Sequence, residues 1–218
     1  MPEKGISKII ELNEDLLANN DELAKKNNKL LHKSKIKSVD LVGAIGAGKT
    51  AIIESIVKRI SKDHRILVIN GDVTTRVDAG RIEKHGVRTI QINTGRECAL
   101  NSYHISQVLT NYDLHQIDLL FIENVGNLIC PSDFILGTDK RVVVVSITEG
   151  EWVIEKHPLL FKTSDIAIIN KIDLLDVIDV NIEKMINDAR EINPKLKIFK
   201  TSALTGENIA EVINELIN

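Results

Sequence analysis

The sequence predicts an α/β fold in which a mainly parallel sheet of about seven strands is flanked by helices. Runs with strand and helix character alternate from about residue 36 onward, a pattern typical of parallel sheets. Several strand-like runs consist almost entirely of Val, Ile and Leu, as expected for strands covered on both faces. A glycine-rich segment separates the first of these strands from the first helix. With 218 residues, the chain fits one α/β domain at 36–218 preceded by a helical extension at 1–35.

The N-terminal extension has the pattern of an amphipathic helix over residues 5–31. Its apolar side chains recur at helical spacing with polar residues between them. These side chains are Ile6, Ile9, Ile10, Leu16, Leu17, Leu23, Leu30 and Leu31. Two interpretations remain open: the helix packs this stripe on the core of its own domain, or it docks on a partner protein.

The α/β region divides into strands and helices that follow one another along the chain. Short apolar runs predict strands at 38–42, 65–69, 87–92, 117–123, 141–148, 165–170 and 195–201. Longer amphipathic stretches predict helices at 49–61, 77–85, 96–111, 180–191 and 207–217. Ligands of such sheets bind beyond the carboxyl ends of the strands, so the residues that follow each strand are the candidate site residues.

The composition excludes several classes of protein. Hydrophobic residues make up 43% of the chain, too large a share for a disordered protein. Two cysteines are too few for a disulfide-dense secreted scaffold, and a net charge of −3 argues against general nucleic-acid binding. No apolar run approaches the roughly 18–20 residues of a membrane span, and no signal-peptide pattern begins the chain. We expect a cytoplasmic protein with reduced thiols that binds neither nucleic acid nor membranes.

A phosphate-binding signature follows the first strand of the α/β region. Residues 43–50 match the pattern G-x4-G-K-[ST] between a predicted strand and a predicted helix. In this motif backbone N–H groups surround phosphate oxygens, the lysine reaches the β- and γ-phosphates, and the hydroxyl binds Mg²⁺. The sequence therefore predicts a P-loop NTPase. Its phosphate-site residues are Gly43, Ala44, Gly46, Ala47, Gly48, Lys49 and Thr50, and Lys49 and Thr50 are also predicted to be catalytic.

Guanine is the predicted base. Residues 170–173 read N-K-I-D after a predicted strand, and the Asp173 carboxylate can accept hydrogen bonds from N1–H and the 2-amino group of guanine, which adenine does not offer. The Lys171 stem can lie along the base, and the N–H of Ala203 or Leu204 can donate to guanine O6. The predicted base site comprises Asn170, Lys171, Asp173, Ser202, Ala203 and Leu204. GTP and GDP are therefore the expected ligands, and 36–218 is the predicted GTP-binding domain.

Two carboxylates near strand ends suit a magnesium ion, which prefers hard oxygen ligands. Thr50, Asp72 and Glu123 are the predicted Mg²⁺ ligands, and Asp72 and Glu123 join the predicted catalytic residues. The Gly126 N–H is expected to sense the γ-phosphate, as loops after this strand do in switch GTPases. Ordinary small GTPases carry Asp-x-x-Gly where this chain has Glu123-x-x-Gly126. No arginine finger or water-positioning glutamine can be identified, which predicts slow hydrolysis.

The two cysteines are candidate metal ligands. The segment Thr94-x-x-Glu97 is interpreted as a helix capping box, which would place Cys98 in the first turn of a helix and lower its pKa. Cys130 follows the Glu123 strand. One chain offers too few thiolates for a closed site, but two chains offer four on a two-fold axis, suited to Zn²⁺ or to square-planar Ni²⁺. Inert thiols remain an alternative, and a disulfide is the outcome that a reducing compartment disfavours.

Taken together, these segments resemble the HypB family of hydrogenase nickel-incorporation GTPases. The resemblance rests on residues 43–50, 71–73, 93–98, 123–131, 148–150, 155–158 and 170–173, of which E-N-V-G-N-L-I-C-P at 123–131 is the most distinctive. It implies slow GTP hydrolysis, nucleotide-dependent dimerisation, a nickel or zinc site between subunits, and nickel delivery to the large subunit of a [NiFe] hydrogenase with a small partner, HypA. Lys156 matches a family position implicated in reaching nucleotide across the dimer.

The chain departs from the family pattern at several positions. Cys98 is followed by Ala99 where the family usually has histidine, and Tyr103 and Gln107 replace histidines common further along that helix. Two other functions therefore remain open. One is a related maturation GTPase for urease or for a cobalamin-dependent mutase. The other is a nucleotide-dependent interaction module that carries no metal.

Overall fold

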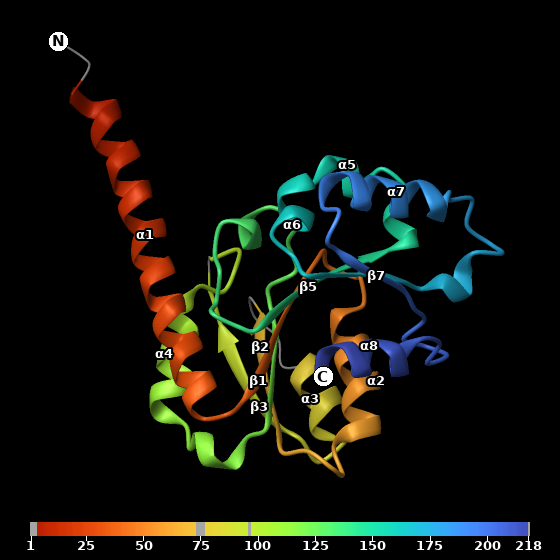
Figure 1. The fold of residues 1–218 in the computed structure, drawn as a ribbon, viewed down its shortest axis with the longest axis horizontal. Coiled ribbons are helices and arrows are strands. Elements are labelled where there is room, and N and C mark those ends of the chain that lie inside the picture. Colours follow the sequence, from red (N-terminus) through yellow and green to blue (C-terminus); the bar gives the residue numbers. More distant parts are fainter. Residues whose placement is uncertain (1–3, 73–76, 96, 218) are drawn as a thin grey trace.

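The computed structural model describes residues 4–72, 77–95 and 97–217. Its strands are β1 (Lys37–Val42), β2 (Ile66–Asp72), β3 (Arg88–Asn93), β4 (Leu119–Glu123), β5 (Lys140–Ser146), β6 (Ile166–Asn170) and β7 (Lys197–Lys200). They form one seven-stranded sheet in the order β3-β2-β4-β1-β5-β6-β7, and each strand pairing in it is parallel (Figure 1). The predicted parallel α/β fold is therefore confirmed, with β1 and its following loop near the centre of the sheet.

Helices cover both faces of this sheet. One face carries α2 (Lys49–Ile60), α3 (Val77–Glu83) and α8 (Ile209–Ile217). The other carries α1 (Lys4–Lys33), α4 (Ser102–Asn111), α5 (Val153–Lys156), α6 (Pro158–Lys162) and α7 (Ile182–Ile192). Short 3₁₀ turns occupy η1 (Leu114–Gln116), η2 (Cys130–Ser132), η3 (Ile147–Glu149) and η4 (Ile172–Leu174). The sequence predicted neither α5 nor α6, which are too short to show a helical period.

The start of α4 corrects one prediction. The helix begins at Ser102 and not at residue 96, because Asn101 is its N-cap. Asn101 Oδ1 accepts hydrogen bonds from the backbone N–H of Tyr103 and His104, and His104 Nδ1 accepts one from Asn101 N at 3.2 Å. This reciprocal pair satisfies the helix N-terminus. Cys98 therefore precedes the helix, and the predicted effect of a first-turn helix dipole on its thiol is wrong.

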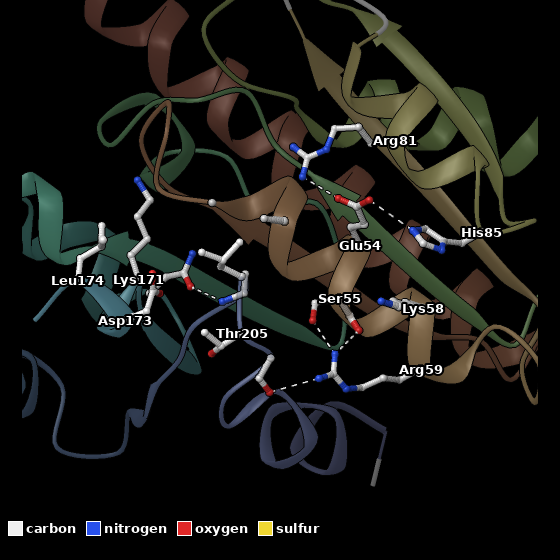
Figure 2. A pocket seen from close by; sticks show the side chains of 16 residues that line it. Glu54, Ser55, Lys58, Arg59, Arg81, His85, Lys171, Asp173, Leu174 and Thr205 are labelled. Atoms are coloured by element: carbon white, nitrogen blue, oxygen red, sulfur yellow. Dashed lines mark hydrogen bonds and ion pairs between the residues drawn. The ribbon is translucent and has the colours of Figure 1, made fainter.

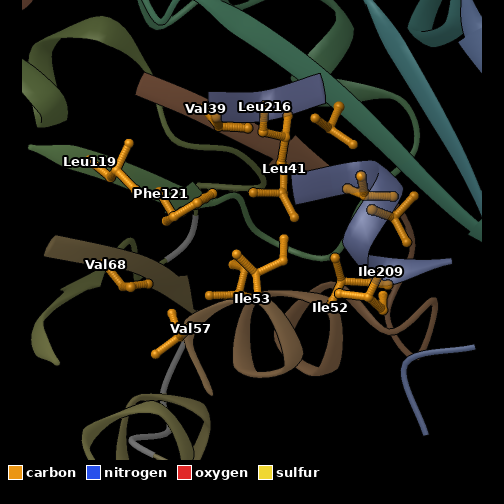
Figure 3. Packing of buried hydrophobic residues seen from close by; sticks show 14 of the residues in the cluster. Val39, Leu41, Ile52, Ile53, Val57, Val68, Leu119, Phe121, Ile209 and Leu216 are labelled. Atoms are coloured by element: carbon orange, nitrogen blue, oxygen red, sulfur yellow. The ribbon is translucent and has the colours of Figure 1, made fainter. Parts of the chain in front are cut away.

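The apolar side of α2 packs on the centre of the sheet. Ile52, Ile53 and Val57 share a buried cluster with Leu41 of β1 and Phe121 of β4 (Figure 3). Burying each such side chain contributes roughly 1.5–3 kcal/mol. Because α2 begins directly after the glycine-rich loop, this packing fixes the helix N-terminus relative to β1 and β4.

The second half of α1 packs on the opposite face. Leu31 is fully buried in a cluster that includes Leu67 and Leu120, and Asn27 Nδ2 donates to the carbonyls of Ser102 and Leu136 at 2.8 and 3.2 Å. These contacts support the core-packing interpretation for this half of the helix. The first half of α1 extends away from the rest of the molecule (Figure 1), so docking on a partner stays a prediction for that half. No helix among the described residues has the length and apolarity to cross a membrane.

A buried ion pair lies at the centre of the sheet. Asp40 is fully buried, and its Oδ2 accepts from Arg141 Nε at 3.0 Å. Arg141 also donates to the carbonyls of Pro131 and Phe134. Burial raises the pKa of the Asp40 carboxyl, an effect that the Arg141 charge counteracts. The pair therefore ties β1 and β5 to the segment after β4.

Replacing Arg141 by alanine is expected to lower the free energy of unfolding by about 3–5 kcal/mol, because it leaves the Asp40 charge buried without its partner. Urea denaturation measures this change. Arg65→Ala is the matched control, since it removes an exposed pair with Asp118 and is expected to cost much less. Equal losses in the two variants would contradict this account.

Candidate nucleotide-binding site

Glycines allow the loop between β1 and α2 to approach its neighbours closely. A Cβ on Gly43 would lie 2.1 Å from the carbonyl oxygen of Val144. Gly48 has φ +105°, and a Cβ there would lie 2.2 Å from Asn170 Nδ2. Side chains at these two positions would therefore push the loop away from β5 and from the predicted base site. The lack of space for a side chain therefore explains why these two positions of the phosphate signature are glycine.

Lys49 folds back over this loop. Its side chain is buried, and Nζ donates hydrogen bonds of 3.0 Å to the carbonyl oxygens of Gly43 and Ala44. The ammonium group therefore lies beside the backbone that the motif uses to surround phosphates. This position matches the predicted role of Lys49, which is to supply positive charge at that place.

Thr50 and Glu123 come together as the sequence predicted for two ligands of one ion. Thr50 Oγ1 donates to Glu123 Oε1 at 2.7 Å, and Asn70 Nδ2 donates to Glu123 Oε2 at 3.0 Å. A hydroxyl and a buried carboxylate are the hard oxygen ligands that Mg²⁺ prefers, so these residues fit a magnesium ion. The Asp72 side chain lies outside the described part of the structure. Asn70 is a member of this group that sequence reasoning missed, although it lies within β2 only two residues before Asp72, which ends the strand.

The segment after β4 crosses the phosphate loop. Asn127 N donates to the carbonyl of Gly43 at 3.0 Å. Gly126 lies so close that a Cβ would be 2.4 Å from Ile45 Cγ1 and 3.1 Å from the Ile45 backbone. The structure therefore places Gly126 against the phosphate loop, where its predicted γ-phosphate role requires it.

Asn170 joins the base site to the phosphate loop. Its Nδ2 donates to the carbonyl of Ala47 at 3.0 Å, and its Oδ1 accepts from Ala203 N at 3.1 Å and from Thr201 Oγ1 at 3.2 Å. Because Asn170 already uses the Ala203 N–H, Leu204 is the remaining candidate of the two for the guanine O6 contact.

Asp173 is oriented by its neighbour. Ser202 Oγ donates to Asp173 Oδ1 at 2.5 Å and accepts from Thr205 N at 3.1 Å. This assigns Ser202 a definite task, namely fixing the carboxylate that is predicted to contact the base.

A cavity of about 820 Å³ lies at the base end of this site (Figure 2), and Lys49, Thr50 and Glu123 are not among its lining residues. Of the predicted nucleotide residues, it brings together Gly48, Asn170, Lys171, Asp173, Ala203 and Leu204. Lys156 does not line it: the residue ends α5 and is exposed. A contact between Lys156 and nucleotide therefore remains a prediction that involves a second chain.

The same cavity extends along α2 to an ionic cluster that the sequence analysis did not predict. Arg81 Nη2 lies 2.6 Å from Glu54 Oε2, and His85 Nε2 lies 3.3 Å from Glu54 Oε1 (Figure 2). Partial burial opposes ionisation of Glu54, but these two partners hold its pKa below the ordinary value. The cluster links α2 to α3, the helix that follows the Asp72 segment.

Glu149 brings a carboxylate near the lysines of the site. Its Oε1 accepts from Ser146 N at 2.8 Å, while its Oε2 is buried with no partner among the described residues. Burial raises the pKa of this carboxyl, and the charges of Lys171 and Lys49 act in the opposite direction. Glu149 is therefore a further titratable group of the site that the motifs left without a role.

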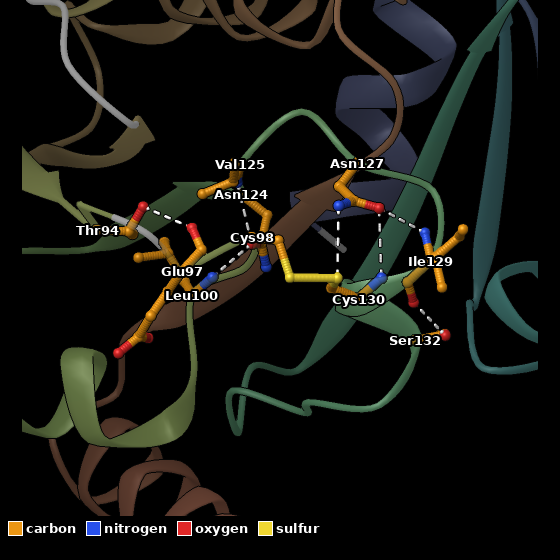
Figure 4. The surroundings of a disulfide bond; sticks show 10 residues. All are labelled: Thr94, Glu97, Cys98, Leu100, Asn124, Val125, Asn127, Ile129, Cys130 and Ser132. Carbon is orange, nitrogen blue, oxygen red and sulfur yellow. Dashed lines mark hydrogen bonds between the residues drawn. A yellow bond between two sulfur atoms is a disulfide. The ribbon is translucent and has the colours of Figure 1, made fainter.

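The cysteine pair corrects another expectation. Cys98 and Cys130 form a disulfide within one chain (Figure 4), with Cα atoms 6.1 Å apart. The segments after β3 and β4 converge, which brings the two Cα atoms into the range that a disulfide requires. The expected free thiols are therefore joined here. Among the described residues, no group of three or more His, Cys, Asp or Glu side chains could hold a metal ion.

Hydrogen bonds tie both cysteine segments to the chain after β4. Asn124 Oδ1 accepts from Leu100 N at 2.9 Å, and Asn127 Oδ1 accepts from Cys130 N at 3.3 Å (Figure 4). Residues 123–127 thus connect the Thr50–Glu123 pair, the phosphate loop and the cysteines. A structural change at one of these three places can therefore reach the other two through a few residues in direct contact.

Reducing the disulfide is expected to lower the free energy of unfolding by about 3–4 kcal/mol, because the bond closes a loop of 32 residues and restricts the unfolded chain. Urea denaturation with and without reductant measures this change. Cys98→Ala is the control, since its stability should not respond to reductant. A wild-type transition that reductant leaves unchanged would show that the bond contributes nothing.

Known proteins resemble this chain over most of its length. Residues 37–200 match the CobW/HypB/UreG nucleotide-binding domain. A probable hydrogenase maturation factor HypB from Methanocaldococcus jannaschii is 47% identical over 205 residues, which are 94% of this chain and 93% of that protein.

Two solved structures share the fold and a substantial part of the sequence. HypB from Archaeoglobus fulgidus has a TM-score of 0.86 at 43% identity, covering 91% of this chain and 97% of that chain. HypB from Helicobacter pylori in complex with nickel has a TM-score of 0.86 at 31% identity, covering 91% and 94%. The chain therefore belongs to the HypB family of hydrogenase maturation factors, within the CobW/HypB/UreG group of nucleotide-binding proteins.

Proposed function

We propose that this chain is a GTP-hydrolysing maturation factor that assists nickel insertion into a [NiFe] hydrogenase. The observation that carries the proposal is the position of Asn170, which connects the N-K-I-D segment to the phosphate loop through Ala47. A guanine motif and a phosphate motif are thereby parts of one site in a member of the HypB family. The resemblance to nickel-bound HypB supports nickel as the cargo.

The residues of the site divide the work on GTP. When GTP binds, the Lys49 ammonium group donates its hydrogen bonds to phosphate oxygens instead of to the carbonyl oxygens of Gly43 and Ala44. The Asp173 carboxylate accepts hydrogen bonds from the edge of the guanine base. Thr50, Glu123 and Asp72 would hold Mg²⁺, which would supply positive charge against the phosphates. Two arginines line the cavity, Arg59 and Arg81, and Arg81 is paired with Glu54. We expect slow turnover, which suits a switch.

Nucleotide state is transmitted through residues 123–127. A contact between Gly126 and the γ-phosphate orders this segment. The ordered segment then allows a second copy of the chain to bind, so that the protein dimerises with GTP. Lys156 of each chain reaches the nucleotide of the other. The same segment contacts Cys130, so the cysteines respond to GTP.

Nickel is bound by the reduced protein. A dithiol reductant supplies the two electrons and two protons that convert the disulfide to two thiols, and is itself oxidised to a disulfide. Cys98 and Cys130 of two chains then provide four thiolates for nickel or for zinc. The metal then passes to the large subunit of the hydrogenase with the help of a small HypA-like partner.

The disulfide, and the alanine at position 99 where the family usually has histidine, favour one second candidate function. In this alternative the chain is a nucleotide-dependent interaction module that leaves the metal to another protein.

Phosphate release from the purified chain tests the GTPase proposal. GTP with Mg²⁺ is expected to be hydrolysed at roughly 10⁻² s⁻¹ or slower, and ATP is expected to be spared. Glu123→Gln should reduce the rate, whereas Glu151→Gln, which changes a carboxylate away from the Thr50–Glu123 pair, should leave it unchanged. Hydrolysis of ATP as fast as GTP would contradict the proposal.

Nickel content tests the maturation role. The hydrogenase large subunit is purified from cells that lack their own HypB and carry either this chain or its Lys49→Ala variant. We expect nickel in the large subunit only with the unaltered chain. Equal nickel content with both chains would contradict the maturation role and leave the GTPase assignment standing.

A further inference from the structure

One buried side chain beside the magnesium ligands has an incomplete set of hydrogen bonds. Asn70 is only 2% exposed. Its Nδ2 donates to Glu123 Oε2 at 3.0 Å, whereas its Oδ1 is buried and has no hydrogen-bond partner among the described residues. Buried polar atoms in native proteins are nearly always partnered. This amide oxygen therefore points to a bound group or water at that place.

The chemistry of the carboxylate fixes which way the amide faces. An ionised carboxylate can only accept hydrogen bonds, so the NH₂ group of Asn70 must face Glu123 and the oxygen must face away from it. The parallel pairing of β2 with β4 places Asn70 opposite Glu123. Thr50 Oγ1 donates to the other oxygen of the same carboxylate at 2.7 Å. Glu123 is thus held between a hydroxyl from α2 and an amide from β2.

A hydrated magnesium ion would supply the donor that Asn70 Oδ1 lacks. Mg²⁺ in phosphate sites binds through one or two carboxylates and keeps several waters, and the O–H groups of those waters need acceptors. Groups that orient metal ligands commonly act from just outside the inner shell. We propose that Asn70 is a positioning residue of the magnesium site, in which Nδ2 orients Glu123 and Oδ1 accepts a hydrogen bond from a magnesium-bound water. The inference rests on the proposed Mg²⁺–GTP function.

The Mg²⁺ dependence of nucleotide binding tests this role. GDP affinity is measured in EDTA and across a Mg²⁺ titration for the wild-type chain, Asn70→Ala and Asn70→Asp. Asn70→Ala is expected to raise the half-saturating Mg²⁺ concentration by about 10–100-fold and to leave the affinity in EDTA unchanged. Asn70→Asp loses the donor to Glu123 but keeps an oxygen acceptor toward the ion, so its half-saturating Mg²⁺ concentration should lie between those of the wild-type chain and Asn70→Ala.

Asn27→Ala serves as the matched control. Asn27 is also buried, at 3% exposed, but its Nδ2 bonds to the carbonyls of Ser102 and Leu136, neither of which is a predicted magnesium ligand. This variant is expected to lower the melting temperature without altering the half-saturating Mg²⁺ concentration. A merely structural role for Asn70 would make Asn70→Ala behave in the same way.

The outcomes separate the inference from the function on which it rests. If the GDP affinity of the wild-type chain does not depend on the Mg²⁺ concentration, the proposed function is wrong. Wild-type Mg²⁺ dependence that Asn70→Ala leaves unchanged would overturn the inference alone. An Asn70→Asp variant as impaired as Asn70→Ala would overturn the role of Oδ1, because loss of the donor to Glu123 would then explain both defects.

Discussion

Lys49→Ala is expected to weaken GTP and GDP binding by about 10²–10⁴-fold, which is the largest effect foreseen for any single change. The buried amine lies over the loop, within reach of the Gly43 and Ala44 carbonyls, and phosphate oxygens would replace those neutral acceptors. Each charge-assisted hydrogen bond contributes roughly 1.5–3 kcal/mol, so losing two of them accounts for this range. Isothermal titration with GDP in Mg²⁺ buffer measures it.

The control for this variant is Lys62→Ala. Lys62 is an exposed lysine that follows the same helix, so its removal changes the net charge by the same amount at a place away from the loop. Its GDP affinity should equal that of the wild-type chain. Unimpaired binding or hydrolysis by Lys49→Ala would show that the assignment of the phosphate loop is wrong.

Asp173→Asn is expected to reverse the base preference from guanine toward xanthine. The carboxylate accepts two donors from guanine, whereas an amide can donate to the 2-carbonyl of xanthine. Mismatched buried groups cost about 1–3 kcal/mol each, so GTP affinity should fall by roughly 10²–10³-fold and XTP affinity should rise. Competition of unlabelled GTP and XTP against a fluorescent GDP measures both changes.

Asp176→Asn provides the comparison for that experiment. Asp176 is an exposed carboxylate three residues beyond Asp173, and it does not line the cavity. We expect its GTP to XTP ratio to match the wild-type value. A ratio that Asp173→Asn also leaves unchanged would contradict the assignment of guanine recognition to this residue.

Features encoded by fixed local spacing could be located from the sequence. The phosphate loop and the N-K-I-D segment are such features, and once both were placed at strand ends the parallel sheet brought them together. The contact between Asn170 and Ala47 joins residues 123 positions apart, yet each partner lies inside a recognisable motif. The pairing of Thr50 with Glu123 followed in the same way from the rule that ligands gather beyond strand ends.

Features that depend on register and loop packing were not predictable in this way. Asn70 meets Glu123 because β2 pairs with β4 in one particular register, and no local pattern encodes that choice. The Thr94-x-x-Glu97 segment is interpreted from the sequence as the cap of the helix. Asn101 forms the observed cap because the Asn101 and His104 side chains each accept a hydrogen bond from the other residue's backbone N–H. The disulfide depends on how the segments after β3 and β4 converge.

Metal binding by the reduced protein tests the central claim most directly. Native mass spectrometry of the reduced chain with a non-hydrolysable GTP analogue, titrated with Ni²⁺ and with Zn²⁺, counts metals and chains in one experiment, and Cys98→Ala is run in parallel. We expect one metal per two chains with the GTP analogue, and no metal in Cys98→Ala or in the oxidised protein. Absence of stoichiometric metal in every nucleotide state, or equal metal in Cys98→Ala, would contradict it and indicate a GTPase that leaves the metal to a partner.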